Sequence, residues 1–312
     1  MKRCIITGAT GFIGANLLRT LLQKGHEVHV LLRPGYNPQR LQDVRDQAQL
    51  HIIDLLDAED TGQVLQAIKA DWIFHLAAHG AYSWQTDAQQ MIQTNLTSTI
   101  NLIESCAKVG FEAFVNTGSS SEYGFKNHPP LEDEIVKPNS MYAITKVAAT
   151  QYCQYVADQQ ELPIATLRLY SAYGPYEDER RFIATLVRRG LQGELPPLVN
   201  PDTARDYVYV EDVCDAYLLA ASKISLELGA IYNIGSGVQT TIRQAVEMAR
   251  KLMHIDVVPD WNSMPNRSWD TSVWVANNDK AIKELGWRPQ HDFQSGLERT
   301  IEWMKKTKNS AT

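Results

Sequence analysis

The sequence has few cysteines, no long hydrophobic run and no excess of positive charge. No Cys-x-x-Cys pair occurs, and the cysteines follow no metal-ligand spacing with the eight histidines, so neither a disulfide framework nor a metal site is predicted. We expect the cysteines to serve as small, buried, apolar side chains of a protein in a reducing compartment. The four cysteines are Cys4, Cys106, Cys153 and Cys214.

The lack of a long apolar run and of excess positive charge limits the partners and the location that we expect for the protein. No apolar stretch approaches the roughly 20 residues that cross a bilayer, and residues 1–7 lead directly into a strand and a glycine turn, which leaves no room for a signal peptide. A net charge of -6 disfavours nucleic acid and anionic membranes as partners. We therefore expect a cytoplasmic protein in which any phosphate site is local.

Short apolar runs alternate with helical stretches in the first half of the chain. Because these runs are apolar throughout, they are typical of parallel strands covered by helices on both faces, as in a doubly wound sheet. Long helices are predicted over residues 87–109 and 140–160. The predicted strands are residues 4–7, 28–32, 50–53, 72–76, 113–117 and 164–169.

The pattern loosens after Gly174 and Pro175. We predict a dinucleotide-binding domain over residues 1–174 and a smaller, mainly substrate-binding α/β lobe over residues 175–312. Some later segments are expected to return to the first domain. Further strands are predicted at 208–210 and 231–234, and the helix after Asp212 is expected to fold back on the main sheet.

Residues 7–14, TGATGFIG, follow the first strand and open a helix. This context turns a glycine spacing into a dinucleotide-binding motif. Gly8 would allow the tight turn, Gly11 the approach of a pyrophosphate to the helix N-terminus, and Gly14 close packing of helix on strand.

The second strand ends at Arg33 with no acidic residue. An arginine there suits the 2′-phosphate of NADP, whereas an acid suits the ribose of NAD, so Arg33 favours NADP, unless it is simply a surface residue. Asp54 follows the third strand, where it would either meet the adenine amino group or cap the next turn.

Tyr142 and Lys146 lie four residues apart on the helix predicted at 140–160, and therefore share one face. A tyrosine has an ordinary pKa near 10, so as a neutral-pH acid or base it needs a nearby cation. Lys146 and an oxidised nicotinamide ring would supply one.

Several separate motifs together resemble the extended short-chain dehydrogenase/reductase family, and in particular its nucleotide-sugar epimerases, dehydratases and reductases. Beside the glycine turn and the Tyr/Lys pair, these motifs are residues 76–78 (LAA), 119–124 (SSSEYG), 169–175 (LYSAYGP), 205–213 (RDYVYVEDV) and 285–289 (LGWRP). The resemblance covers nearly the whole chain and implies a Rossmann-type α/β fold, an enzyme and a homodimer. The dimer would pair helices 87–109 and 140–160 across a two-fold axis.

The resemblance also implies roles for individual residues. Tyr142 would exchange the proton of a sugar hydroxyl, Lys146 would hold the nicotinamide ribose, and Ser119, or alternatively Ser120, would bind the same oxygen. The remaining cofactor contacts would come from Gly8, Thr10, Gly11, Phe12, Ile13, Gly14, Arg33, Asp54, Leu55, Leu76, Ala77, Ala78, Thr117 and Tyr170. Substrate contacts would come from His79, Ser120, Ser171, Arg181, Arg205 and Arg267, the last two converging on a diphosphate.

Some residues depart from the family pattern, and these departures favour some of the family's reactions over others. The acidic pair of the dehydratases is replaced by Ser120 and Ser121, with Glu122 one position late, which disfavours elimination; Ser171 replaces an asparagine common in 4-epimerases. We favour an NADPH-dependent 4-ketoreductase of nucleotide sugars, because Arg33 suits an exchanging cofactor. The alternatives are a nucleotide-sugar 4-epimerase with bound NAD, a reductase of non-nucleotide carbonyl compounds and a non-catalytic dinucleotide sensor.

Overall fold

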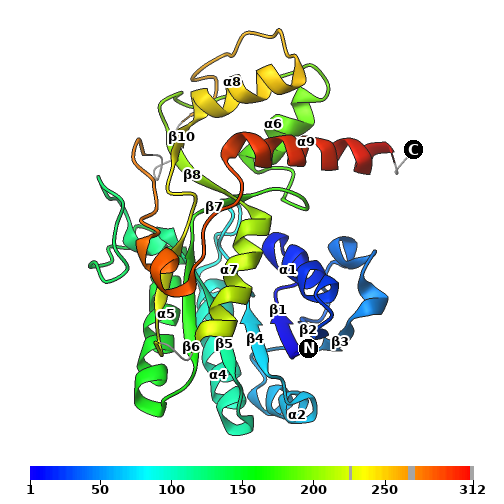
Figure 1. Cartoon of the computed structure of the whole chain (residues 1–312), viewed down its shortest axis with the longest axis vertical. Helices are drawn as coiled ribbons and strands as arrows, with labels where there is room; N and C mark the ends of the chain where they lie inside the picture. Colours follow the sequence, from blue (N-terminus) through cyan, green and yellow to red (C-terminus); the bar gives the residue numbers. More distant parts are fainter. Residues whose placement is uncertain (225–226, 266–270, 310–312) are drawn as a thin grey trace.

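A computed structural model describes residues 1–224, 227–265 and 271–309. Its main feature is a seven-stranded parallel sheet in the order β3-β2-β1-β4-β5-β6-β9, next to a three-stranded sheet in the order β10-β8-β7 (Figure 1). The predicted doubly wound, Rossmann-type sheet is thereby confirmed. The strands are β1 Arg3–Thr7, β2 Glu27–Leu32, β3 Gln49–Ile52, β4 Trp72–His75, β5 Ala113–Ser119, β6 Ile164–Leu169, β7 Ser171–Tyr173, β8 Ala204–Tyr209, β9 Ile231–Ile234 and β10 Gln239–Thr241.

Helices cover both faces of the large sheet. α1 and α7 pack with the apolar core of one face, and α2, α4 and α5 with that of the other. The α-helices are α1 Phe12–Gln23, α2 Ala58–Ile68, α3 Ala88–Ile92, α4 Ser98–Val109, α5 Met141–Gln160, α6 Phe182–Gly190, α7 Val210–Lys223, α8 Ile242–Met253 and α9 Phe293–Asn309. Shorter helical segments are η1 Gln39–Leu41, η2 Arg45–Gln47, η3 Gln93–Thr97, η4 Ser120–Tyr123 and η6 Ala281–Leu285.

The burial of each strand follows its place in the sheet. β6 is buried along its whole length because helices cover both faces, whereas β3 lies at the edge and leaves Ile52 56% exposed. None of the helices in the described residues is long and apolar enough to cross a bilayer.

The helix predicted at 87–109 is interrupted. Its middle turn, η3, is a π-helical segment between α3 and α4, and it turns the side chain of Asn95 into the protein interior, where it is fully buried. Such bulges are frequent at functional sites. The periodicity of apolar residues does not reveal this extra residue in the turn.

The second half of the chain divides its elements between the two sheets. β7, β8 and β10 gather with α6, α8 and α9 at one end of the molecule, around their own apolar core (Figure 1). β9, which was predicted as a strand, instead pairs with β6, and α7 packs on β5 and β6, as expected for the helix that folds back on the main sheet. The division at residue 174 remains a prediction.

The strand order reverses between β1 and β4. In open parallel sheets ligands bind outside the carboxyl ends of the strands at this point. The glycine turn leaves β1 there and residues 76–78 leave β4.

Candidate active site

The glycine turn has the shape that a dinucleotide requires. Gly8 has φ +72°, and a Cβ on it would lie 2.5 Å from the carbonyl carbon of Leu76. A Cβ on Gly14 would lie 2.3 Å from the oxygen of Gly8, so any side chain at either position would push the turn away from β4 and α1. Phe12 is buried and Ile13 packs against the same core.

The N-terminus of α1 is open to an anion. Gly11 is its N-cap, no side chain caps it, and its first turn carries no acidic residue. Free N–H groups and the positive end of the helix dipole favour a phosphate at this place. The residues present therefore fit the pyrophosphate of an NAD(P) cofactor.

The residues predicted to bind the adenosine part of the cofactor lie at the protein surface. Arg33 is exposed at the end of β2, and Asp54 is exposed after Ile53. One carboxylate oxygen of Asp54 accepts the N–H of Leu56 at 3.0 Å, so it stabilises the local turn, while α2 itself is capped by Asp57. Leu55 is half-buried against the core of that face.

α5 places Tyr142 and Lys146 on one face, one turn apart. The helix begins after Ser140, whose hydroxyl accepts the N–H of Ala143. Ser119 ends β5, the neighbouring element; its hydroxyl donates to Oγ of Ser121 at 3.1 Å, and the Ser119 side chain acts to lower the pKa of Tyr142. The structure thus brings the three predicted catalytic side chains to the carboxyl end of the sheet.

Burial controls the charges at this site. It raises the pKa of Tyr142 to about 12, although the hydrogen bond with Ser119 and the charge of Arg181 act to lower it. Burial also lowers the pKa of the Lys146 ammonium, and with the charge of Lys146 it lowers that of His75 to about 3. His75 is consequently neutral at pH 7 and bridges the hydroxyls of Thr7 and Thr99.

Ser119 is held by a buried ion pair. The Glu122 carboxylate accepts the Ser119 N–H on Oε1 at 2.7 Å and the Arg168 Nε–H on Oε2 at 2.8 Å. Both charged side chains are almost fully buried. Glu122 therefore has both oxygens engaged in fixing the end of β5.

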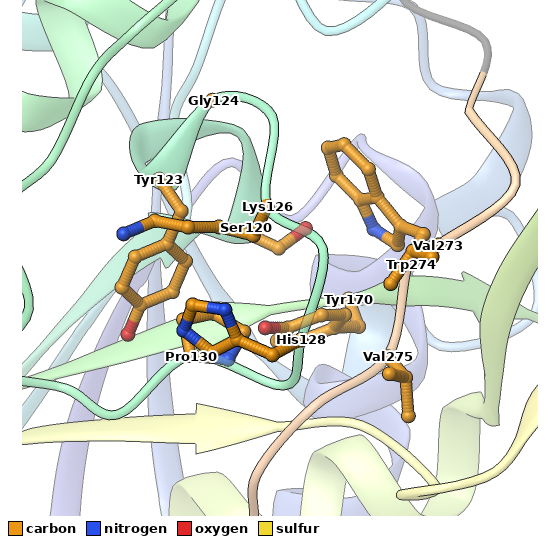
Figure 2. Close-up of a pocket in the computed structure, with 10 residues that line it drawn as sticks. All are labelled: Ser120, Tyr123, Gly124, Lys126, His128, Pro130, Tyr170, Val273, Trp274 and Val275. Atoms are coloured by element: carbon orange, nitrogen blue, oxygen red, sulfur yellow. The ribbon is translucent and has the colours of Figure 1, made fainter.

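A cleft lies beside the catalytic residues. It is partly open to solvent rather than an enclosed cavity. Figure 2 shows the lining side chains around one space, with His128 coming from the loop after Gly124 and Trp274 from residues 271–276. Among the predicted site residues it takes in Ser120 and Tyr170.

Other predicted residues surround this region. Leu76 and Ala77 donate their N–H groups to the Thr7 hydroxyl, and Ala78 is exposed. Thr117 does not face the site with its hydroxyl, which donates to the carbonyl of His75 and contacts the Tyr217 hydroxyl. Two more residues, His79 and Ser171, are half-buried, and the carbonyl of Thr10 accepts a hydrogen bond from Arg40.

The predicted substrate arginines have different surroundings. Arg205 on β8 lies over the Trp274 ring, 5.4 Å from its centroid, and so belongs to the rim of the cleft. Arg181 precedes α6 and its charge acts on Tyr142. Arg267 lies outside the described residues.

Sequence reasoning missed Asn95. Its Oδ1 accepts the N–H of His79, and its Nδ2 donates to the His79 carbonyl and to the Thr145 hydroxyl on α5. It thereby joins the loop after β4 to the helix that carries Tyr142. The neighbouring residues 93–99 are mostly polar as well, so nothing in the sequence sets Asn95 apart.

Comparison with known proteins gives consistent matches over nearly the whole chain. The model of the NAD dependent epimerase/dehydratase family matches residues 4–235. UDP-glucose 4-epimerase of Mycolicibacterium smegmatis is 31% identical, with 97% of this chain and 98% of that protein covered. The structure of UDP-glucose 4-epimerase from Thermotoga maritima with UDP-glucose matches at TM-score 0.89 and 28% identity, covering 98% of this chain and 99% of that one. UDP-glucuronic acid 4-epimerase from Bacillus cereus, with UDP-glucuronic acid and NAD, matches at TM-score 0.87 and 26% identity, with the same coverage.

Proposed function

The chain belongs to the NAD-dependent epimerase/dehydratase family, and from this premise we propose that it is a nucleotide-sugar 4-epimerase that keeps NAD bound. The proposal reverses the preference that Arg33 suggested. It rests on the arrangement of Ser119, Tyr142 and Lys146 at the carboxyl end of the sheet. It rests also on relatives that are themselves 4-epimerases of UDP-sugars.

The chain's own residues account for the proton transfers. Tyr142 would remove the proton of the sugar C4 hydroxyl and return it after the keto intermediate has turned, while Ser119 holds the same oxygen by a hydrogen bond. Lys146 would bind the nicotinamide ribose and offset the high pKa of the buried phenol. A bound nicotinamide cofactor supplies the hydride acceptor and donor.

The geometry argues against elimination of water from the sugar. A dehydratase needs a carboxyl group free to move a proton beside the strand-end serine. Here Ser120 and Ser121 stand in those places, and both oxygens of Glu122 are occupied by the Ser119 N–H and Arg168. The acid next in sequence is thus a structural group.

A 4-keto-sugar reductase using NADPH is the second candidate. It would use the same catalytic residues, and the exposed Arg33 at the end of β2 favours it, because this position can meet a 2′-phosphate. The two candidates differ in whether the cofactor stays bound through turnover.

The test combines cofactor content with turnover. Mass spectrometry of nucleotides released from fresh protein should find NAD(H), and UDP-glucose should be converted to UDP-galactose without added cofactor. Consumption of NADPH with 4-keto nucleotide sugars by a protein free of NAD would contradict the epimerase. Tyr142→Phe should lose turnover while keeping its bound cofactor and unfolding midpoint; near-normal turnover would refute the role of Tyr142.

We also propose a homodimer and a division of labour along the chain. α5 exposes Ile144 and Tyr155, at 48% and 63%, on a helix whose opposite side is buried, which suits a helical interface with a second copy. Residues 1–174 with β9 would bind the cofactor, and the rest of residues 175–312 would form most of the substrate lobe. Light scattering at micromolar concentration should give twice the 35.1 kDa chain mass.

A further inference from the structure

The segment of residues 174–181 connects β7 to α6 and touches the cofactor turn. Arg40 donates from Nε to the carbonyl of Tyr176 at 2.7 Å and from Nη1 to the carbonyl of Thr10 at 3.1 Å. Asn16 on α1 also donates to the carbonyl of Pro175. This segment is therefore fixed in place beside the predicted phosphate site.

Within this segment Glu177 is an unusual carboxylate. Its side chain is only 4% exposed, its Oε1 lies 3.3 Å from Nε of Arg181, and its Oε2 is buried without a hydrogen-bond partner. A charged oxygen in that position carries a desolvation cost that no hydrogen bond to it offsets. Burial accordingly raises the pKa of Glu177 to about 7, against the lowering effect of Arg181.

Arg181 is the partner through which Glu177 can reach the active site. It is 40% exposed, so it is accessible to a ligand, and it directly precedes α6, whose first turn has no acidic residue. Its charge acts on Tyr142. The positive end of the helix dipole adds to the attraction that this corner offers an anion.

We propose that Glu177 is a positioning residue: its carboxyl group holds the Arg181 guanidinium toward Tyr142 and sets how much uncompensated positive charge this arginine presents to the negatively charged substrate. The inference rests on the proposed function for the identity of that anion. When Glu177 is ionised it neutralises Arg181; when it is protonated, the full charge of Arg181 attracts the substrate. Substrate affinity should therefore rise as the pH falls through 7.

Other charged and titratable groups face this pair from each neighbouring element. Asp178 in the same segment raises the pKa of Glu177, and Arg40 lowers it. Tyr82, in the loop after β4, and Tyr207 on β8 face Arg181. Of these groups, Glu177 is the one that forms the ion pair with Arg181 and is buried at its free oxygen.

The first measurement needs no substrate. In protein labelled with ¹⁵N-arginine, the Nε signal of Arg181, assigned by its loss in Arg181→Lys, should shift with an inflection near pH 7. The inflection should vanish in Glu177→Gln, which keeps a carbonyl for Arg181 but no charge. It should persist in the control Glu179→Gln, an exposed acid of the same segment. An Arg181 signal that does not titrate between pH 6 and 8, or that still titrates in Glu177→Gln, overturns the proposal.

The second measurement uses calorimetric binding of UDP-glucose, whose diphosphate has no group that titrates between pH 6 and 8. The wild type and Glu179→Gln should bind at least ~5-fold more tightly at pH 6 than at pH 8, the lower end of typical coupling between two sites. Glu177→Gln should bind tightly at both values, and equal pH dependence in this variant also overturns the proposal. If the wild type binds no UDP-glucose while its Arg181 signal follows Glu177, the proposed substrate is refuted and the coupling of the two residues is supported.

Discussion

Replacing Arg168 with methionine should destabilise the protein and disturb its active site through one buried carboxylate. The Arg168 side chain is 2% exposed and that of Glu122 is fully buried. Arg168 also donates to the carbonyl of Glu132 at 2.9 Å, and its guanidinium lies 4.6 Å from the Tyr123 ring centroid. Methionine would preserve most of the apolar stem but leave Glu122 charged, buried and unpaired.

The magnitude follows from that unpaired charge. Breaking a buried ion pair by removing one partner typically costs about 3–5 kcal/mol. Glu122→Gln in the Arg168→Met background removes the charge while keeping an oxygen for the Ser119 N–H, so the double variant should be more stable than Arg168→Met alone. Turnover should fall in Arg168→Met because the end of β5 loses its anchor.

Urea unfolding followed by tryptophan fluorescence measures these differences. Arg180→Met is the matched control, since Arg180 pairs with Asp178 but is 62% exposed, and its unfolding midpoint should barely change. Equal midpoints for Arg168→Met and Arg180→Met, or a double variant no more stable than Arg168→Met, would refute the reasoning.

Three further predictions concern other parts of the molecule. Burial lowers the pKa of His75 to about 3, so the unfolded chain binds one more proton than the native chain between pH 3 and 6.5. The free energy of unfolding should therefore decrease as the pH is lowered from 6.5 to 3, by up to about 1.4 kcal/mol per pH unit, and His75→Asn should flatten this dependence in urea titrations. Gly14→Ala should abolish cofactor retention in mass spectrometry because its Cβ would lie 2.3 Å from the Gly8 oxygen, whereas Gly62→Ala, in open space on α2, should not. Changing both Ile144 and Tyr155 to glutamate should give a monomer in light scattering with the cofactor still bound, and an unchanged dimer would place the interface elsewhere.

The sequence was most informative where local chemistry decides the structure. Apolar runs predicted the strands of the parallel sheet, including β9, and the spacing of Tyr142 and Lys146 predicted their common helix face. The glycines of the first turn predicted their own close contacts, because only a missing Cβ permits those distances.

Long-range packing was beyond the reach of the sequence. Asn95, in the turn that interrupts the helix, bonds to residues distant in the chain, and Glu122 pairs with the distant Arg168. No spacing rule predicts such contacts. Burial was equally hidden, so the raised pKa of Tyr142 in this structure could not be inferred from a neighbouring lysine. The relatives, which are 4-epimerases, favour the other candidate than Arg33 does, since a single exposed side chain at a strand end says little about how firmly a cofactor is held.

β9 is synthesised well after β6, its neighbour in the sheet, and this delay affects folding of the nascent chain. Thr166 of β6 pairs with Ile231 of β9, so about 65 more residues must be synthesised before one edge of β6 has its neighbouring strand. At 5–20 residues per second this takes roughly 3 to 13 s. During that time an unpaired edge of buried, apolar sequence can pair with another nascent chain. We expect the yield of folded protein in cells to depend on the rate of elongation between β6 and β9, and chaperones to engage the nascent chain in this interval.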